Sequence, residues 1–163
     1  MIKIGLLSDT HGYLHERVLN FFIAVDEIWH AGDIGSVQVC EQLSALKPLR
    51  AVFGNIDGWE IRSEYPEALV FTVEEVKVAM RHIAGYPGRY DPSVLKLIRN
   101  EKPGLFICGH SHILKVIYDK TNHHLHINPG AAGKYGLHKS ITAVRFRIDG
   151  KEITDLEDLD IPR

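Results

Sequence analysis

The stretch Lys3–Gly12, with the sequence KIGLLSDTHG, joins a short apolar segment to a polar turn. The apolar residues show no clean alternation with polar ones, which is typical of a strand buried on both faces. The turn that follows carries Asp9 and His11. Side chains at positions i and i+2 of an extended segment point the same way, so we expect both to reach one ion. The stretch therefore predicts a buried strand that ends in a metal-binding turn.

The next segments repeat this order of strand, polar turn and helix. Further strands are predicted at Glu27–His30 and Arg50–Phe53, and helices at Leu14–Val25 and at Val37–Leu46, the second with Ser36 as its N-cap. Strands that alternate with helices imply right-handed crossovers and therefore a parallel sheet.

The second half of the chain is richer in strands. We expect a hairpin, a helix capped by Asp91, a buried strand and then three antiparallel strands. In chain order these are Leu69–Val73 with Val76–Met80, Pro92–Asn100, Leu105–Cys108, Ile113–Tyr118, His123–Ile127 and Ile141–Ile148. Lys151–Leu156 adds a last strand, and the acidic run Asp155–Asp160 is expected to be a solvated tail. We therefore expect two packed sheets with helices outside, in a single domain of residues 1–163 whose segment 151–163 holds the last strand and the tail.

Composition excludes several classes of protein. The chain has 163 residues, a formal net charge of -2, 45% hydrophobic and 25% charged residues, which does not fit a disordered chain. A near-neutral charge also argues against a nucleic-acid binder held by bulk positive charge. No apolar run approaches the roughly 20 residues that a membrane helix needs, and nothing resembles a signal peptide, so we expect a cytoplasmic protein. The two cysteines, Cys40 and Cys108, are expected to be buried free thiols.

The ends of the predicted strands carry oxygen or imidazole ligand types. Besides Asp9 and His11, these are Asp33, Asn55, His82, His110 and His112. The set contains no cysteine, which suits a borderline-to-hard metal rather than a structural thiolate zinc site. Two adjacent divalent ions, about 3.5–4 Å apart in hydrolytic sites, need a set of this size with one bridging carboxylate. The sequence therefore predicts a dinuclear metal centre.

These residues stand in motifs that occur together in one known family. The motifs are Asp9-Thr10-His11, Gly32-Asp33, Gly54-Asn55, His82, Gly109-His110-Ser111-His112 and the loop NPGAAG at 128–133. In this order and spacing the chain resembles the calcineurin-like metallophosphoesterase superfamily, and most of all its small bacterial and archaeal phosphodiesterase branch, to which the retromer subunit is related in fold. The resemblance extends roughly from Met1 to Ile148.

The resemblance implies an α/β fold, a four-layer αββα sandwich of two mixed β-sheets flanked by helices. It implies that the first metal is held by Asp9, His11 and His112, and that Asp33 bridges both ions. The second metal would take Asn55, His82 and His110. Mn²⁺ is the expected metal, with Ni²⁺, Fe²⁺, Zn²⁺ or Co²⁺ as alternatives.

The implied reaction is hydrolysis of a P–O bond by a hydroxide that bridges the two ions. Asp33, Asn55 and His110 are the expected catalytic residues, and a small phosphodiester or phosphomonoester is the expected substrate. Asn55 and Arg89 are expected to bind the substrate, since a guanidinium pairs well with phosphate. Tyr86 or Tyr90 could stack on an aromatic group of the substrate.

One position departs from the family pattern. Many members have His directly after the motif asparagine, where it helps to protonate the leaving group. This chain has Ile56 there, which cannot donate a proton. We therefore expect a preference for good leaving groups.

Other polar residues receive structural interpretations. We expect His30 to be a buried structural histidine and Asp57 to support its turn through backbone N–H groups. His123, His124 and His126 fit a strand with one exposed face better than a further metal site, and His138 fits a solvated loop position better than a substrate contact.

Alternatives to the diesterase stay open at this stage. They are a catalytically inactive scaffold or protein-binding module of the same fold, and a phosphomonoesterase. A nuclease fits the net charge less well, and a homo-oligomer is neither favoured nor excluded.

Overall fold

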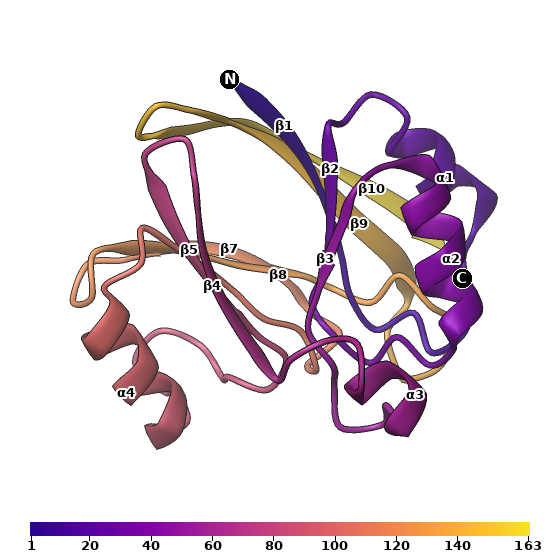
Figure 1. Ribbon diagram of the computed structural model, residues 1–163, viewed down its shortest axis with the longest axis horizontal. Helices are drawn as coiled ribbons and strands as arrows, with labels where there is room; N and C mark the ends of the chain where they lie inside the picture. The colour runs from indigo at the N-terminus through magenta and orange to yellow at the C-terminus, as the bar shows by residue number, and fades with distance from the viewer.

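The computed structural model describes all residues, Met1–Arg163, as two five-stranded sheets that face each other (Figure 1). The first sheet has the order β10-β9-β1-β2-β3. Its strands are β1 (Ile2–Leu7), β2 (Glu27–His30), β3 (Leu49–Ala51), β9 (Ser140–Asp149) and β10 (Glu152–Pro162). The second sheet has the order β4-β5-β6-β8-β7. Its strands are β4 (Ala68–Val73), β5 (Val76–Arg81), β6 (Leu105–Ile107), β7 (Leu114–Asp119) and β8 (His124–Pro129).

Both sheets are mixed. Strands β1, β2 and β3 run parallel, as do β5, β6 and β8, whereas β9 is antiparallel to β1. One expectation is corrected here: β8, which falls in the segment expected to be antiparallel throughout, is antiparallel to β7 but parallel to β6. Strand β7 runs in the opposite direction and returns the chain to the end of the sheet where β6 begins. Strand β8 can therefore run parallel to β6.

The chain has four helices, which are α1 (Glu16–Phe21), α2 (Val37–Leu46), α3 (Trp59–Arg62) and α4 (Pro92–Glu101). Three of them, α1, α2 and α4, cover the outer faces of the sheets, while α3 lies beyond the end of β3 (Figure 1). Helices α1 and α2 pack on the first sheet and α4 on the second, so the predicted α/β sandwich with four layers is confirmed.

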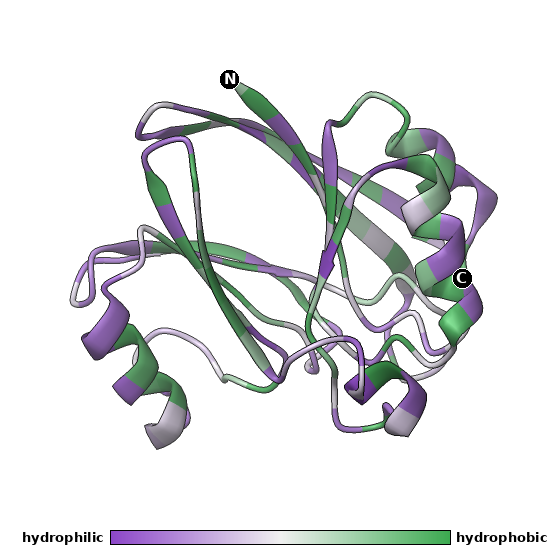
Figure 2. Cartoon of the chain, in the orientation of Figure 1, coloured by the Kyte–Doolittle hydropathy of each residue, from purple (hydrophilic) through white to green (hydrophobic).

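Apolar residues of the strands point alternately into two different cores. Ile4 and Leu6 of β1 belong to the core between the sheets, while Leu7 packs on the helical side. In β5 and β6, Met80 and Ile107 face the core between the sheets, and Phe106 faces α4. Figure 2 shows the corresponding alternation of hydrophobic and hydrophilic residues along the strands. Strands with two buried faces account for the apolar runs in the sequence.

The first predicted helix is much shorter than expected. Periodicity indicated Leu14–Val25, but α1 ends at Phe21. The cause is tertiary: the Asp26 carboxylate accepts a hydrogen bond from the Lys3 N–H, and the Asp26 N–H donates to the Lys3 carbonyl. These two bonds direct the chain toward β2. Val25 lies outside the helix but still packs in the core on the helical side of the first sheet.

The acidic C-terminal segment is not a solvated tail. It forms β10, which pairs with β9 along its length apart from an irregularity between Thr154 and Glu157. Ile161 is buried and Leu159 packs against the same core, while the acidic residues of the segment, Asp155, Glu157, Asp158 and Asp160, are exposed. Glu157 also pairs with Arg145. The charge run therefore marks the exposed face of an edge strand. No helix of the structure is long and apolar enough to cross a membrane.

Candidate metal centre

The seven predicted ligands come from loops that follow β1, β2, β3, β5 and β6. The carboxyl ends of these strands point to the same edge of the two sheets, and their loops gather there (Figure 1). Ligand sites in α/β proteins form beyond the carboxyl ends of parallel strands. The fold thus brings together side chains that lie up to a hundred residues apart in the sequence.

A first group of ligand atoms surrounds the buried Asp9 carboxylate. Its Oδ1 atom lies 3.2 Å from His112 Nε2, 3.7 Å from His82 Nε2 and 3.9 Å from His11 Nε2. The other oxygen, Oδ2, accepts hydrogen bonds from the Ser8 hydroxyl and the His110 N–H. Burial opposes ionisation of Asp9, but the imidazoles of His11 and His112 outweigh it and hold the pKa of this carboxyl well below its usual range.

Asp33 connects this group to a second one. Its Oδ2 atom lies 3.4 Å from His11 Nε2 and 3.2 Å from His82 Nε2. The second group contains Asp33, His82 and His110. His110 Nδ1 lies 3.1 Å from Asn55 Oδ1, so the asparagine joins the second group as well. An oxygen between the two sets of imidazoles is the position that a bridging carboxylate requires.

The donor set fits divalent cations. Asp9 Oδ1, His11 Nε2 and His82 Nε2 are buried and have no hydrogen-bond partner. Unpartnered buried polar atoms are costly, and one cluster of them needs an explanation. Neighbouring ligands of an octahedral ion with bonds of about 2.1 Å lie about 3.0 Å apart, close to the shorter separations between these atoms. The residues thus form two adjoining groups that could each hold an ion.

Hydrogen bonds on the far side of the rings fix which nitrogen faces the centre. The Nδ1–H of His82 donates to the Ala31 carbonyl at 2.7 Å, which leaves Nε2 as the ligand atom. His138 Nε2 donates to the Gly133 carbonyl at 2.7 Å, so its Nδ1 can accept from His112 Nδ1 at 3.2 Å. His112 Nε2 therefore keeps its lone pair toward the centre. Partners of this kind orient metal ligands in proteins.

The backbone at the centre is strained. Five of the predicted ligands have positive φ: Asp9 (54°), His11 (46°), Asp33 (54°), His110 (73°) and His112 (63°). This conformation is uncommon for residues other than glycine and clusters at functional sites. It also corrects the reason given for the Asp9-x-His11 spacing, since the two side chains converge from a left-handed turn and not from an extended segment.

Asp57 holds two ligand loops together. Its carboxylate accepts hydrogen bonds from the N–H groups of Ile34, Gly35 and Gly54. The predicted role of Asp57 in supporting its turn is thus confirmed, and it extends to the loop after Asp33. Gly54 is required by close approach, because a Cβ atom there would overlap Asp33.

Other histidines lie outside the centre. His30 is fully buried, with hydrogen bonds to the Thr10 hydroxyl and from the Gly32 N–H, and burial lowers its pKa to about 4. Its predicted structural role is confirmed. The prediction of an exposed face for the later histidines is wrong: His124 and His126 are buried and both hydrogen-bond to the Tyr90 hydroxyl.

The substrate-contact candidates divide into those near the centre and those away from it. Arg89 is exposed, makes no side-chain hydrogen bond or ion pair, and does not line a cleft that contains the ligands. Tyr90 is turned toward the buried histidines. Tyr86 lines a cleft of about 400 Å³ that also contains His110.

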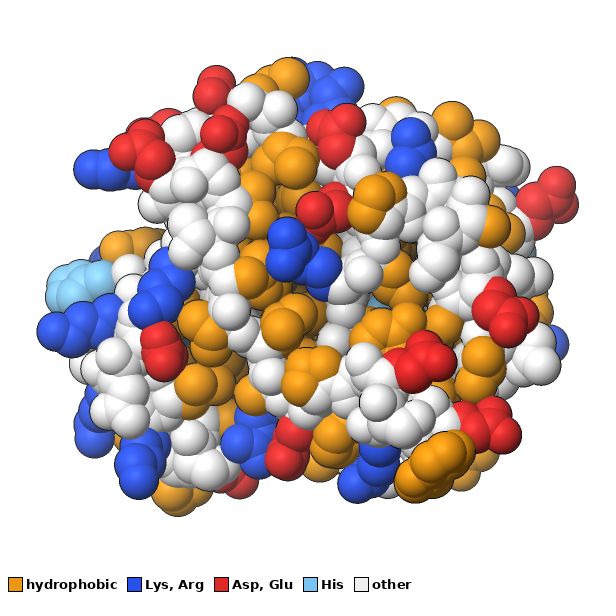
Figure 3. Space-filling model, in the orientation of Figure 1, with side chains coloured by type: hydrophobic (Ala, Val, Ile, Leu, Met, Phe, Trp, Pro, Cys, Tyr) orange, Lys and Arg blue, Asp and Glu red, His pale blue; other side chains and the backbone are white.

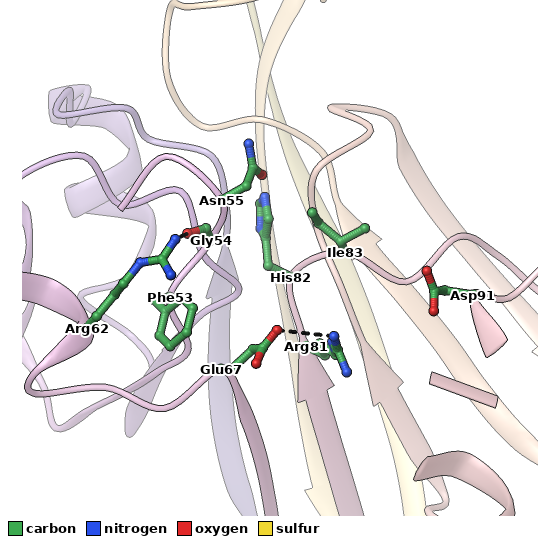
Figure 4. Close-up of a pocket in the computed structure, with 9 residues that line it drawn as sticks. All are labelled: Phe53, Gly54, Asn55, Arg62, Glu67, Arg81, His82, Ile83 and Asp91. Carbon is green, nitrogen blue, oxygen red and sulfur yellow. Dashed lines mark hydrogen bonds and ion pairs between the residues drawn. The ribbon is translucent and has the colours of Figure 1, made fainter. Parts of the chain in front are cut away.

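Sequence reasoning missed several neighbours of the centre. His138 was expected to be solvated, yet it contacts a ligand. Tyr135 stacks on His11 with ring centroids 5.1 Å apart. Both follow the glycine-rich loop at 128–133, and only that loop could have indicated them. Arg62 and Arg81 line a cleft of about 300 Å³ together with the ligands Asn55 and His82 (Figure 4). No motif contains these arginines.

Comparison with known proteins identifies the family. Residues 2–151 match the calcineurin-like phosphoesterase superfamily domain. A curated protein of Methanothermobacter thermautotrophicus, named "Probable metallophosphoesterase", is 31% identical over 158 residues, which cover 92% of this chain and 88% of the relative. The chain therefore belongs to the calcineurin-like phosphoesterase superfamily, and its His and Asp clusters are consistent with the metal site of such a protein.

Solved structures share the fold over nearly the whole chain. A structure described as a novel archaeal phosphodiesterase has a TM-score of 0.75 and 23% identity, covering 98% of this chain and 100% of that one. Vps29 of Entamoeba histolytica, in complex with zinc, has a TM-score of 0.77 and 16% identity, covering 98% and 99%. At these identities the likeness shows the fold.

Proposed function

We propose that this protein is a metal-dependent phosphodiesterase that hydrolyses a P–O bond at a dinuclear centre. Asp9, His11 and His112 would hold one ion, Asn55, His82 and His110 the other, and Asp33 both. The observation that carries this proposal is the convergence of buried, unpartnered carboxylate and imidazole atoms around Asp9 Oδ1 and Asp33 Oδ2. We propose Mn²⁺ as the metal, with Ni²⁺, Fe²⁺, Zn²⁺ or Co²⁺ as alternatives.

When bound, two divalent ions supply an activated water as nucleophile and neutralise charge on the phosphoryl oxygens. The residues of the chain supply position. Asp33 aligns the two halves of the centre, and its second oxygen is held by the Ile56 N–H at 3.0 Å. Asn55 turns its carbonyl oxygen toward His110, which leaves its NH₂ group free to donate to a phosphoryl oxygen. His110, beside Asn55, completes the proposed catalytic set.

The leaving group receives no help from Ile56. This side chain follows Asn55 and is 46% exposed, but it carries no proton donor. The proposed enzyme therefore acts best on esters whose leaving group is stable as an anion. This expectation separates it from relatives that have histidine at the same position.

A small substrate fits the surroundings of the centre. The clefts that contain the ligands have volumes between about 300 and 440 Å³. Figure 3 shows acidic and basic side chains interspersed over the face in view, without a basic stripe that would track a long nucleic acid. We propose a small phosphodiester as substrate. Arg89, which has no ion-pair partner, stays a proposed contact for its phosphate.

A scaffold of the same fold is the competing function, since Vps29 shares the architecture. The ligand set argues against it. A scaffold gains nothing from buried polar atoms without partners, which lower the stability of the metal-free fold.

Hydrolysis of bis-p-nitrophenyl phosphate tests the proposal. Metal-stripped protein should be inactive, added Mn²⁺ should restore activity, and Asp33→Ala and His110→Ala should abolish it. His123→Ala is the matched control, because His123 is exposed and lies outside the centre. Folded protein that stays inactive with every divalent metal would overturn the diesterase. Activity confined to p-nitrophenyl phosphate would reassign it as a monoesterase.

A further inference from the structure

The cleft lined by Asn55 and His82 contains a cation that the proposed reaction does not use. Arg62, the last residue of α3, lines this cleft but pairs with no carboxylate in the structure (Figure 4). The other charged side chains of the cleft have partners. Arg81 donates to Glu67 at 3.1 Å, and the Asp91 carboxylate caps α4 by accepting from Ser93. Arg62 is therefore the one charged residue of this cleft whose side chain has no side-chain partner for a hydrogen bond or ion pair.

The guanidinium of Arg62 is held in place from behind. It lies over the Phe53 ring, with Cζ 4.4 Å from the ring centroid. Its Nε–H donates to the Asp57 carbonyl, and Nη2 approaches the Gly54 carbonyl at 3.5 Å. A guanidinium has five N–H donors. At least three of the Arg62 donors therefore have no protein acceptor. The orientation of the guanidinium is already fixed, and it lies next to Gly54, the residue before Asn55.

A pre-positioned guanidinium with free donors suits an anion with several oxygens. Arginine binds phosphate through two parallel hydrogen bonds, and the fixed orientation reduces the entropy lost on binding. A terminal phosphate carries nearly two negative charges at neutral pH, so it gains more from a cation without an ion-pair partner than a neutral group would. Arg81 stands in the same cleft, and its partner Glu67 has a side chain that is 61% exposed.

We propose that Arg62, assisted by Arg81, forms a subsite for a second phosphate, borne on one arm of the phosphodiester substrate. The inference rests on the proposed function, because the cleft adjoins the centre only through Asn55 and His82. It narrows the substrate class to small phosphodiesters with a terminal phosphate. It also assigns recognition of the terminal phosphate to Arg62, which belongs to none of the sequence motifs.

Two dinucleotides test this subsite with the full-length, Mn²⁺-loaded protein. The probes are the adenylyl dinucleotide ApA and its 5′-phosphorylated form pApA, and the readout is the ratio of their kcat/KM values. The wild-type ratio should favour pApA by about tenfold or more, the usual weight of a charge-assisted hydrogen bond. Arg62→Gln should bring the ratio close to one, and Arg62→Lys should retain part of it.

The variants separate a binding role from a structural one. Arg62 also packs on Phe53, so Arg62→Gln could disturb the Asn55 loop, which would lower both kcat/KM values without changing their ratio. Glu67→Gln provides a second test that leaves Arg62 in place: it frees Arg81 and should raise the preference for pApA severalfold. Arg99→Gln is the matched control, because Arg99 is an exposed arginine of α4 that lies outside the cleft.

The outcomes also separate this inference from the function beneath it. Hydrolysis of bis-p-nitrophenyl phosphate with equal values for pApA and ApA, or with turnover of neither dinucleotide, would overturn the subsite and leave the diesterase standing. A ratio that Arg62→Gln leaves unchanged, or that Arg99→Gln abolishes instead, would do the same. Failure to hydrolyse any of the three compounds would overturn the diesterase and the subsite together.

Discussion

Ile56 follows Asn55 and has no proton to donate to a leaving group, and its exposed side chain makes this position open to a test. Ile56→His should place a proton donor beside the leaving group. We expect kcat/KM for an unactivated alkyl phosphodiester to rise by about tenfold to a hundredfold, while bis-p-nitrophenyl phosphate changes little, because nitrophenolate needs no proton. Steady-state kinetics with Mn²⁺ would measure both.

Ile56→Gln is the control for this substitution, since glutamine is polar but does not titrate near neutral pH. Equal gains from Gln and His would mean that polarity and not proton donation had limited the rate. An unchanged rate for Ile56→His on alkyl esters would show that the leaving group does not depart at this position.

His138 is a second residue whose substitution should have a measurable effect, in this case on metal affinity. It accepts the Nδ1–H of His112, and its loss leaves the ring of that ligand free to rotate or change tautomer. We expect His138→Ala to weaken Mn²⁺ binding by about 10-fold to 100-fold, as for other partners of metal ligands. Titration calorimetry would measure the affinity. His138→Gln keeps an acceptor and should lose less, and equal affinities for all three proteins would refute the role.

At the scale of elements, Asp57 connects the loop after β2 to the loop after β3. Asp57→Ala would leave three backbone N–H groups without their acceptor. We expect the free energy of unfolding to fall by about 3 kcal/mol, since each unpaired buried donor costs about 1–3 kcal/mol and water can reach part of this loop. Urea denaturation of the metal-free protein would measure it. A loss below about 1 kcal/mol would mean that the loops are held by other contacts.

The elements also show what the sequence could and could not predict. The ends of β1, β2, β5 and β6 were predictable because an apolar run met a turn rich in glycine and polar residues. The length of α1 was not, because Asp26 ends it through bonds to Lys3, a residue far away in sequence. The character of β10 was hidden for a related reason. Its acidic residues resembled a tail, and only pairing with β9 shows that Leu159 and Ile161 face a core.

The candidate site could be predicted from the sequence only in part. Candidate ligands such as Asp9 and Asp33 belong to short motifs, so the chain alone indicates them, and the structure brings them into groups that could hold an ion. Residues that touch the ligands could not be predicted in this way. His138 reaches the centre from a loop, and Arg62 lines the adjoining cleft from a four-residue helix. The paths of both segments depend on packing, and neither segment has a periodicity that shows where a side chain points.

At the scale of the whole molecule, buried histidines make stability depend on pH. Burial lowers the pKa of His126 to about 4, while an unfolded chain has a histidine pKa of about 6.5. Between these values the unfolded state binds a proton that the folded state does not, so stability is lost as pH falls from about 6.5 to about 4. His126 alone accounts for about 3 kcal/mol over this interval, at about 1.4 kcal/mol per pH unit.

Comparison with His126→Gln isolates this contribution. Burial lowers the pKa of His30 in the same way, whereas the nearby carboxylates raise the pKa values of His11 and His82 in the metal-free chain, with the opposite effect on stability. These contributions cancel when both metal-free proteins are unfolded at a series of pH values. The variant should show a flatter curve between pH 6.5 and 4, and parallel curves would contradict the assignment.

At five predicted ligands the left-handed backbone lowers the stability of the metal-free fold, while the side chains at these positions are the ones proposed to bind metal. Glycine would relieve about 1–2 kcal/mol at each of these positions, and each such change would remove a ligand. A redesign for thermal resistance that considered only the metal-free chain would therefore erase the centre first. In a lineage that no longer needed catalysis, selection for stability would favour the same glycine substitutions. Left-handed backbone is therefore a sign of metal binding where several such aspartates and histidines converge, as at this centre, and not at isolated positions such as His123 or Asp155.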